Sequence, residues 1–337
     1  MRISWYLFFF FCSFVLTGIF RWFALKVDLV DIPTSRSSHS KPTPRGGGIA
    51  VVITFILGSW TLFVFGEIPA KEFYGVVLSS GIIALVGLYD DYHSLPPLSR
   101  LAVHLVVSSL AVFFLFSSPV VPLFSMKIHL EWVGMVMLVV SLTWMLNLYN
   151  FMDGIDGIAG VEAITTSLSV LFLLWIHGRE SCYMAWLGIL SVSVGGFLIW
   201  NWPPAKIFMG DACSGFLGYI MGVFALLTSS DKGVNVWTWG ILLGIFIIDA
   251  TLTLVQRIIN RENVTQAHRC HAYQILARRF GSHKKITMTV CAVNLCWLLP
   301  FALLSVFFEN YSILFLIFSY APILLFFWRT GAGKKNI

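Results

Sequence analysis

Long runs of hydrophobic residues alternate with short polar segments along the whole 337-residue chain. Each run has about 17 to 25 residues, the length at which an α-helix crosses a bilayer. Polar residues do not alternate within the runs, which excludes the strands of a membrane β-barrel. The pattern therefore predicts an all-α polytopic integral membrane protein with about 11 transmembrane helices in a single membrane domain, residues 1–337. The predicted spans are 4–24, 46–65, 73–89, 101–118, 132–149, 158–176, 184–200, 212–228, 237–255, 287–308 and 311–328.

The composition supports this class and excludes others. Hydrophobic residues make up 58% of the chain and charged residues 11%, whereas about 25% are charged in an ordinary soluble domain. The first run is interpreted as a span and not as a signal peptide, because it is long, basic residues follow it and no A-x-A site does. The six cysteines are scattered without C-x-x-C spacing, so neither a disulfide scaffold nor a zinc site is indicated.

The basic residues predict the orientation of the spans. With the N-terminus outside, 17 of the 22 Lys and Arg residues fall in inside loops and five in outside loops. Since cytoplasmic loops carry the excess of Lys and Arg, the split favours N-out and C-in. The net charge of +6 is thus read as a topology signal and not as a nucleic-acid surface. The predicted cytoplasmic loops are 25–45, 90–100, 150–157, 201–211 and 256–286.

Carboxylate and amide side chains gather at the inner ends of several spans. Asp90 and Asp91 are adjacent at a helix end, where they can bind a hard cation such as Mg²⁺ or accept a proton. Further along, Asn147, Asn150 and Asp153 recur every three residues and would share a helix face, with Asp156 three residues later. Such a stripe suits a metal, a sugar or a nucleotide.

Two further positions each have a structural alternative. Asp211 is the first residue of a predicted helix, so it is either a ligand or an N-cap. Arg45 lies in a Pro- and Gly-rich segment with Arg36, His39 and Lys41, where the residues either bind phosphate or mark the cytoplasmic side.

The longest inside loop is also the most basic. It contains His268, Arg269 and His271, which are suited to acid–base chemistry and phosphate binding. The H-x-x-H spacing alone is weak evidence for zinc, and the remaining basic residues of the loop also suit anionic lipid headgroups. Asp249 lies within the ninth span, where an ionisable residue indicates function.

Acids that bind Mg²⁺ and bases that bind phosphate thus share one membrane face. This combination points to phosphoryl transfer between a cytosolic nucleotide and a lipid phosphate, with the active site on the cytoplasmic face. The chain has no G-x-x-x-x-G-K-[ST] loop and no kinase motifs, so ATP use is not supported.

Five stretches in order resemble the bacterial polyprenyl-phosphate N-acetylhexosamine-1-phosphate transferases, a glycosyltransferase 4 type family. They are SRSSHSKPTPRGGGI, GLYDDYHSLPPLSRLAVH, NLYNFMDGIDGIAG, FMGDACSGFLG, and DATLTLVQR with AHRCHAYQ. The resemblance implies transfer of HexNAc-1-phosphate from a UDP-sugar to undecaprenyl phosphate in the bacterial inner membrane, with release of UMP. Such a step initiates O-antigen or other cell-envelope polysaccharide synthesis.

The family roles carry over residue by residue. The resemblance implies Mg²⁺, with Mn²⁺ as a substitute, held by Asp211, Asp153 and Asp91. Its implied partners are UDP-N-acetylhexosamine, undecaprenyl phosphate and the lipid bilayer, with a homodimer left open and no nucleic acid. Catalytic roles fall on Asp90, Asp91, Asp153, His268 and His271, and substrate binding on Arg45, Asn147, Asn150, Asp156, Phe208, Asp249 and Arg269.

Departures from the family pattern concern the donor sugar. No third Asp follows the Asp pair, Cys213 stands where Gly is common, and the HRCH segment has fewer histidines than in GlcNAc-using members. The AHRCHAYQ form looks more like the O-antigen branch that handles UDP-FucNAc or UDP-QuiNAc. UDP-GlcNAc stays open as the donor, and the related phospho-MurNAc-pentapeptide translocase is disfavoured.

Two other functions are weighed against the enzyme. A secondary transporter would place polar groups near the bilayer midplane, often with repeat symmetry, whereas these carboxylates lie at helix ends and no repeat is visible. A passive lipid-phosphate-binding protein would not need several acids and two Asn together. For the enzyme, direct attack by the lipid phosphate is favoured over a covalent intermediate on an Asp.

Overall fold

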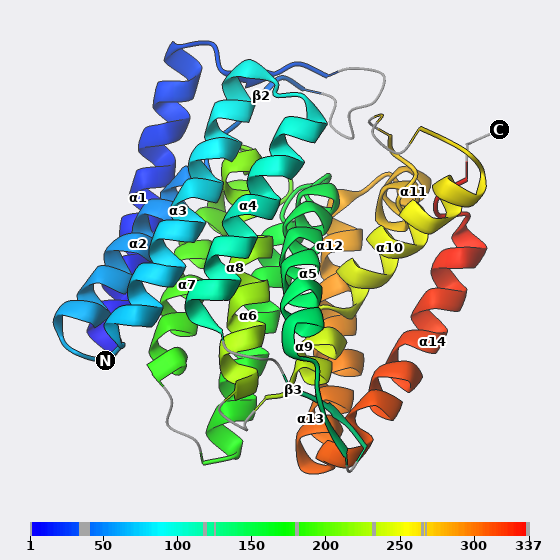
Figure 1. Ribbon diagram of the computed structural model, residues 1–337. Coiled ribbons are helices and arrows are strands. Elements are labelled where there is room, and N and C mark those ends of the chain that lie inside the picture. Colours follow the sequence, from blue (N-terminus) through cyan, green and yellow to red (C-terminus); the bar gives the residue numbers. More distant parts are fainter. Residues whose placement is uncertain are drawn as a thin grey trace.

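The computed structural model describes residues 2–33, 41–116, 120–124, 126–178, 182–230, 234–263, 266 and 268–334. They form a bundle of helices with two short antiparallel strand pairs at its ends (Figure 1). The strands are β1 (Val30–Asp31), β2 (Thr43–Pro44), β3 (Val120–Leu123) and β4 (Met126–His129). The helices are α1 (Ile3–Lys26), α2 (Ile49–Val64), α3 (Ala70–His93), α4 (Pro97–Leu115), α5 (Glu131–Met152), α6 (Ile158–Ile176), α7 (Cys182–Asn201), α8 (Asp211–Ser230), α9 (Val236–Leu242), α10 (Gly244–Ile259), α11 (Ala272–Phe280), α12 (His283–Val293), the π-helical η1 (Asn294–Leu298), α13 (Leu299–Phe307), the 3-10 helix η2 (Glu309–Tyr311) and α14 (Ser312–Thr330).

The predicted all-α polytopic membrane fold is confirmed. Within the described residues, nine helical spans are long and apolar enough to cross a membrane, and the bent pair α9 and α10 brings the number to ten. The remaining predicted span, 46–65, corresponds to α2, an apolar helix of 16 residues. All eleven hydrophobic runs are therefore helical, but two of them are not straight helices of full spanning length.

Helix α8 lies at the centre of the bundle. It aligns the elements of what we call the polar end, the end of the bundle where α3 and α5 finish and α8 begins. Its membrane-spanning part is 89% buried, the highest share among the described spans. A Cβ atom on Gly87 of α3 would come within 2.7 Å of the Ala212 Cα atom at the start of α8. Small residues allow such close approach between membrane helices. The absence of a side chain at Gly87 thus brings the end of α3, with its two Asp residues, against the first turn of α8.

The predicted inside loops are shorter than expected, because helices extend into them. Asp90 and Asp91 belong to the last turns of α3, and Asn150 still belongs to α5. The predicted loop 256–286 begins with the end of α10 and contains all of α11. Gly281, at φ +61°, ends α11, and the Ser282 hydroxyl caps α12 by accepting the Lys285 N–H. The segment predicted as an inside loop between two spans therefore contains helical structure of its own.

The ninth predicted span is broken. The axes of α9 and α10 differ by 80° across Leu243, and α10 slants toward the polar end of the bundle (Figure 1). The bend places α10, the second half of this span, beside the segment that leads to α11.

The N-out, C-in orientation predicts labelling by thiol reagents. Helix α1 begins at the end of the bundle opposite the polar end, and α14 finishes at the polar end (Figure 1). In intact cells, a membrane-impermeant maleimide is expected to label a cysteine that replaces exposed Lys71, but not one that replaces exposed Lys284. The unmodified chain gives the background from its own cysteines, and permeabilised cells should expose both positions. Labelling at 284 in intact cells would contradict the orientation.

Candidate active site

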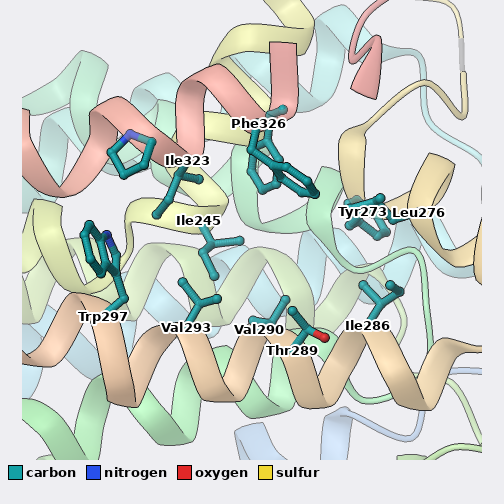
Figure 2. Close-up of a pocket in the computed structure, with 12 residues that line it drawn as sticks. Ile245, Tyr273, Leu276, Ile286, Thr289, Val290, Val293, Trp297, Ile323 and Phe326 are labelled. Carbon is teal, nitrogen blue, oxygen red and sulfur yellow. The ribbon is translucent and has the colours of Figure 1, made fainter. Parts of the chain in front are cut away.

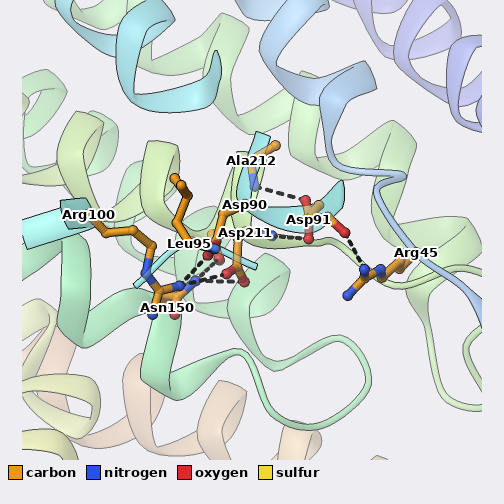
Figure 3. A network of polar contacts seen from close by, with 9 residues as sticks. Arg45, Asp90, Asp91, Leu95, Arg100, Asn150, Asp211 and Ala212 are labelled. Carbon is orange, nitrogen blue, oxygen red and sulfur yellow. Dashed lines mark hydrogen bonds and ion pairs between the residues drawn. The ribbon is translucent and has the colours of Figure 1, made fainter. Parts of the chain in front are cut away.

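The polar end holds a network that joins α3, α4, α5 and α8 (Figure 3). Both carboxylate oxygens of Asp91 accept backbone N–H groups at the start of α8, from Asp211 at 3.1 Å and from Ala212 at 3.3 Å. Helix N-termini offer unpaired N–H groups and a positive dipole end, so this carboxylate stabilises α8 from outside. The Arg45 guanidinium donates to the backbone carbonyl of Asp91, which attaches the first inside segment to the same point.

Asp211 is held in place by neutral and cationic donors. Asn150 donates to Asp211 Oδ1 at 3.0 Å and to the Ser214 hydroxyl at 2.9 Å. Arg100 lies 3.1 Å from Asp211 Oδ2 and also pairs with Asp90, whose other oxygen accepts the Leu95 N–H at 2.5 Å. The Asp211 side chain stays 39% exposed, so its carboxylate remains accessible to a ligand.

A polar cavity of about 320 Å³ opens beside this network. Five Asp side chains line it, against the basic groups Arg45 and His283. Its lining is Asp31, Arg45, Asp91, Asp153, Gly154, Ile155, Asp156, Asn201, Phe208, Met209, Gly210, Asp211, Gln274 and His283. The cavity therefore has an excess of negative charge and favours a cation or a ligand that brings one.

Asp153 is a carboxylate of this cavity without a hydrogen-bond donor among the described residues. It follows α5 directly, and no described residue donates a hydrogen bond to its side chain. Burial, followed by the charges of Asp211, Asp91 and Asp156, raises its pKa well above the usual value. Because each cause penalises the negative charge, a divalent cation at this position would relieve it.

The donor set fits Mg²⁺ in its usual mode. Among the residues that the structure describes, no three His, Cys, Asp or Glu side chains converge into a complete metal centre. Mg²⁺ is commonly held by one or two carboxylates together with substrate phosphates and water. Asp153 and Asp211 both line the cavity and can serve in this way. Asp91, predicted as a third ligand, instead caps α8 with both its oxygens.

The other predicted groups of the helix-end stripe separate in space. The Asn147 amide donates to the Thr143 carbonyl within α5 at 2.7 Å, and Asn147 is not among the residues that line the cavity. Asp156 does line it, with Oδ2 accepting the Ala205 N–H at 3.0 Å and Oδ1 at 3.2 Å from His283 Nδ1. The three-residue spacing therefore placed Asn150 and Asp153 at the site, but not Asn147.

Asp249 holds the start of α11. It is fully buried, and its carboxylate accepts the backbone N–H groups of Ala272 at 2.8 Å and Tyr273 at 2.9 Å. His271 Nδ1 lies 3.4 Å from Asp249 Oδ1. A carboxylate occupied in this way positions a helix, so we replace the predicted substrate contact of Asp249 by a positioning role.

The predicted histidine motif does not contribute to the described lining of the cavity. Among the described residues, His268, Arg269 and His271 are absent from the cavity lining. The rings of His268 and His271 lie 4.9 Å apart, and His268 Nδ1 lies 3.1 Å from the Cys270 sulfur. This arrangement gives no direct support to the predicted catalytic roles of the two histidines.

Of the phosphate-binding candidates in the segment with Arg45, Arg36 and His39 lie outside the described residues.

The protonation of His268 leads to a prediction about pH. Burial, followed by the nearby His271 and Arg257, lowers its pKa to about 4. A lowered histidine pKa means that the ring is neutral above about pH 4 and gains a proton only below it. We therefore expect His268→Gln to leave the shape of the pH–activity profile between pH 6 and 8 unchanged. A profile measured on both proteins tests this, and loss of an acid limb near pH 6 in the variant would contradict it.

Asp31, Asn201 and three further polar residues at the site were not predicted. Arg100 pairs with Asp90 and Asp211, and Gln274 and His283 line the cavity from α11 and α12. Arg100 and Gln274 lie within the quoted LPPLSR and AHRCHAYQ stretches, so the motifs held a signal for them. His283 lies in a basic stretch whose charge suggested only lipid headgroups.

A second cavity, of about 380 Å³, lies among α10, α11, α12, η1 and α14 (Figure 2). Its polar lining atoms are satisfied elsewhere: the Tyr273 hydroxyl donates to Phe151 O, the Thr289 hydroxyl to Lys285 O, and the Trp297 indole N–H to Ser319 O. An apolar space without free polar groups favours hydrocarbon over water. Tyr273 lines this cavity and the next residue, Gln274, lines the polar one, so the first turn of α11 contributes to the walls of both.

Comparison with known proteins gives consistent matches. The family model described as glycosyl transferase family 4 matches residues 73–229. A Bacillus subtilis protein named probable undecaprenyl-phosphate N-acetylglucosaminyl 1-phosphate transferase is 29% identical over 287 residues, 83% of this chain and 78% of the relative. An undecaprenyl-phosphate alpha-N-acetylglucosaminyl 1-phosphate transferase of Thermotoga maritima is 28% identical over 280 residues, 82% of this chain and 83% of the relative. A phospho-N-acetylmuramoyl-pentapeptide-transferase of Streptococcus pneumoniae is 25% identical over 228 residues, 64% of this chain and 67% of the relative.

Proposed function

The chain belongs to glycosyl transferase family 4, and we propose that it transfers an N-acetylhexosamine 1-phosphate group from a UDP-sugar to undecaprenyl phosphate, releasing UMP. The observation that carries this proposal is the presence of two cavities that share the first turn of α11 as part of their walls. One is lined by five carboxylates and suits a metal-bound diphosphate, and the other is apolar and suits the chain of a lipid. An enzyme that joins a water-soluble nucleotide sugar to a membrane lipid needs both.

The proposed setting is the bacterial inner membrane, with the polar end facing the cytoplasm. There the product would start an O-antigen or another cell-envelope polysaccharide. UDP-GlcNAc is one candidate donor, supported by the names of the relatives. UDP-FucNAc and UDP-QuiNAc are the others, supported by the AHRCHAYQ sequence.

The geometry supports a division of tasks around the diphosphate. Mg²⁺ held by Asp153 and Asp211 would supply positive charge to the diphosphate oxygens. Arg45, which lines the cavity, is placed to bind phosphate, and Asn150 and Arg100 fix the Asp211 carboxylate. Asp90 forms an ion pair with Arg100 and accepts the Leu95 N–H. We therefore propose that Asp90 orients Arg100 and does not take a proton from undecaprenyl phosphate.

The proposed reaction is a single displacement. An oxygen of undecaprenyl phosphate attacks the sugar-linked phosphorus, a new P–O bond forms, and the P–O bond to UMP breaks. The acceptor phosphate is already anionic near neutral pH, so placement in line and charge neutralisation carry most of the catalysis. Single displacement inverts the configuration at phosphorus in a chiral thiophosphate donor. Retention, together with exchange of labelled UMP into the donor without lipid, would replace this route by a covalent intermediate on an Asp.

Reconstitution of the purified protein tests the proposed function. With a UDP-sugar panel, undecaprenyl phosphate and Mg²⁺ in detergent or liposomes, we expect equal amounts of UMP and lipid diphosphate sugar. Omission of the lipid should stop UMP release. Uptake of intact UDP-sugar into sealed liposomes without UMP formation would instead support a transporter, and binding of lipid phosphate without turnover would support a passive binding protein.

A further inference from the structure

The lining of the polar cavity includes two groups of residues of different origin, which we call its two walls. In the first wall, the segment with Arg45 runs beside the segment with Phe208, because Phe208 N–H donates to Pro44 O at 2.8 Å and Gly47 N–H donates to Phe208 O at 2.9 Å. The second wall consists of Gln274 and His283, from the start of α11 and of α12. Asp156, which lies just after α5, is 3.2 Å from His283 Nδ1.

Gln274 is fixed in place but leaves one hydrogen-bonding group unused. Its side chain is hydrogen-bonded to the Tyr273 hydroxyl, which itself donates to Phe151 O at 2.9 Å. Its Nε2 atom lies 2.9 Å from the position that a Cβ atom on Gly154 would take, so Gly154 makes room for it. Gln274 is 9% exposed, and among the described residues its buried Oε1 atom has no hydrogen-bond partner.

A buried acceptor without a partner is costly, because it loses its hydrogen bonds to water and gains none in return. Since Gln274 lines the cavity, a bound ligand can remove this cost by donating to Oε1. The charged diphosphate of a UDP-sugar has only acceptor oxygens, so it cannot supply the donor. A ligand group that satisfies Gln274 Oε1 directly therefore carries a hydroxyl or an amide N–H.

Two parts of a UDP-sugar carry such donors, the nucleoside and the sugar. Phe208 is the one Phe, Tyr or Trp among the described lining residues, and its flat face suits a nucleobase. Because Phe208 belongs to the first wall, we assign the nucleobase to that wall. The diphosphate is assigned to a metal held by Asp153 and Asp211. The sugar then lies against the wall formed by Gln274 and His283.

We propose that Gln274 Oε1 accepts a hydrogen bond from a hydroxyl or the acetamido N–H of the hexosamine, which makes Gln274 a specificity determinant for the donor sugar. This rests on the proposed function, because it takes a UDP-HexNAc as the ligand. His283, 3.2 Å from Asp156 through its Nδ1 atom, stands beside Gln274 as the second side chain of the sugar wall.

The test measures binding separately from transfer. Dissociation constants of UDP-GlcNAc, UDP-FucNAc, UDP-QuiNAc and UMP are determined by titration of the full-length protein with Mg²⁺ present. The unmodified protein is compared with Gln274→Met, which keeps the length of the side chain but removes the acceptor. Gln274→Glu keeps an acceptor oxygen at the same place. Gln266→Met is the matched control, because Gln266 is exposed and takes part in hydrogen bonds through its backbone.

We expect Gln274→Met to weaken binding of the preferred UDP-sugar by about tenfold, the value of one hydrogen bond left unmade. UMP binding should stay unchanged, and it also reports that the variant is folded. Gln274→Glu should bind the sugar nucleotide more tightly than Gln274→Met, and Gln266→Met should behave like the unmodified protein.

Other outcomes would overturn the proposal. An equal loss of UMP and UDP-sugar binding would place Gln274 at the nucleoside, and unchanged binding of both would remove it from the site. Failure of the unmodified protein to form lipid-linked product would count against the proposed function. The binding comparison would still decide whether Gln274 contacts a sugar nucleotide.

Discussion

Asp211→Asn is expected to reduce the turnover number by about 100-fold or more, as when a preorganised charge-stabilising group is removed from an active site. The substitution keeps the size of the side chain and can keep one oxygen beside Asn150, so the fold should be retained. It removes one of the two carboxylates assigned to the metal and leaves Arg100 paired with Asp90 alone. Initial rates of lipid-linked product formation, with saturating UDP-sugar and Mg²⁺, provide the measurement.

Asp28→Asn serves as the matched control for this variant. Asp28 is exposed just after α1, and its positive φ of 56° is a conformation that Asn also tolerates. We expect its turnover to equal that of the unmodified protein. If Asp211→Asn kept more than a tenth of the turnover number of the unmodified protein, the central role of Asp211 in the site would be refuted.

Removal of divalent metal is expected to abolish transfer. The polar cavity brings together five Asp residues, and the pKa of Asp153 is raised by burial and by its acidic neighbours. A negatively charged diphosphate would be repelled from this cavity unless a cation came with it. Excess EDTA should therefore stop product formation, and Mg²⁺ or Mn²⁺ should restore it.

Asp153→Asn should separate the role of the metal from that of other groups. Because it removes a carboxylate that no described residue contacts by a hydrogen bond, we expect the Mg²⁺ concentration for half-maximal activity to rise by about tenfold or more. Binding of Mn²⁺, followed by electron paramagnetic resonance, should weaken in parallel. Full activity of the unmodified protein in excess EDTA would exclude a metal-dependent reaction.

Much of the fold could be predicted from the sequence, because the bilayer imposes a simple rule. A backbone that crosses hydrocarbon must satisfy its own hydrogen bonds, so each apolar run of about 20 residues becomes a helix. Each of the eleven runs is accordingly helical in the structure. The runs did not reveal the 80° bend between α9 and α10, because the two halves together form one apolar stretch in the sequence. Nor did they reveal α11, which is short and carries basic residues in its last turn.

The chemistry of the site was visible in the sequence as residue types and spacing. Asp153 and Asp211 were predicted as metal ligands, and both line the polar cavity. The spacing of Asn150 and Asp153 near the end of α5 predicted that they lie close together: Asp153 lines the cavity, and Asn150 donates to Asp211, which also lines it. These features are local, and local features are what a sequence pattern records.

The tertiary structure alone decided which polar groups are available to a ligand and which hold the scaffold. Asp91 and Asp249 looked like functional carboxylates, but each accepts two backbone N–H groups at the start of a helix distant in sequence. Gln274 belongs to the AHRCHAYQ stretch but was not predicted as a site residue, and it became a candidate because its buried Oε1 atom has no partner among the described residues. The physical reason is the same for all three: a hydrogen bond depends on the position of its partner, and that position is set by the packing of segments far apart along the chain.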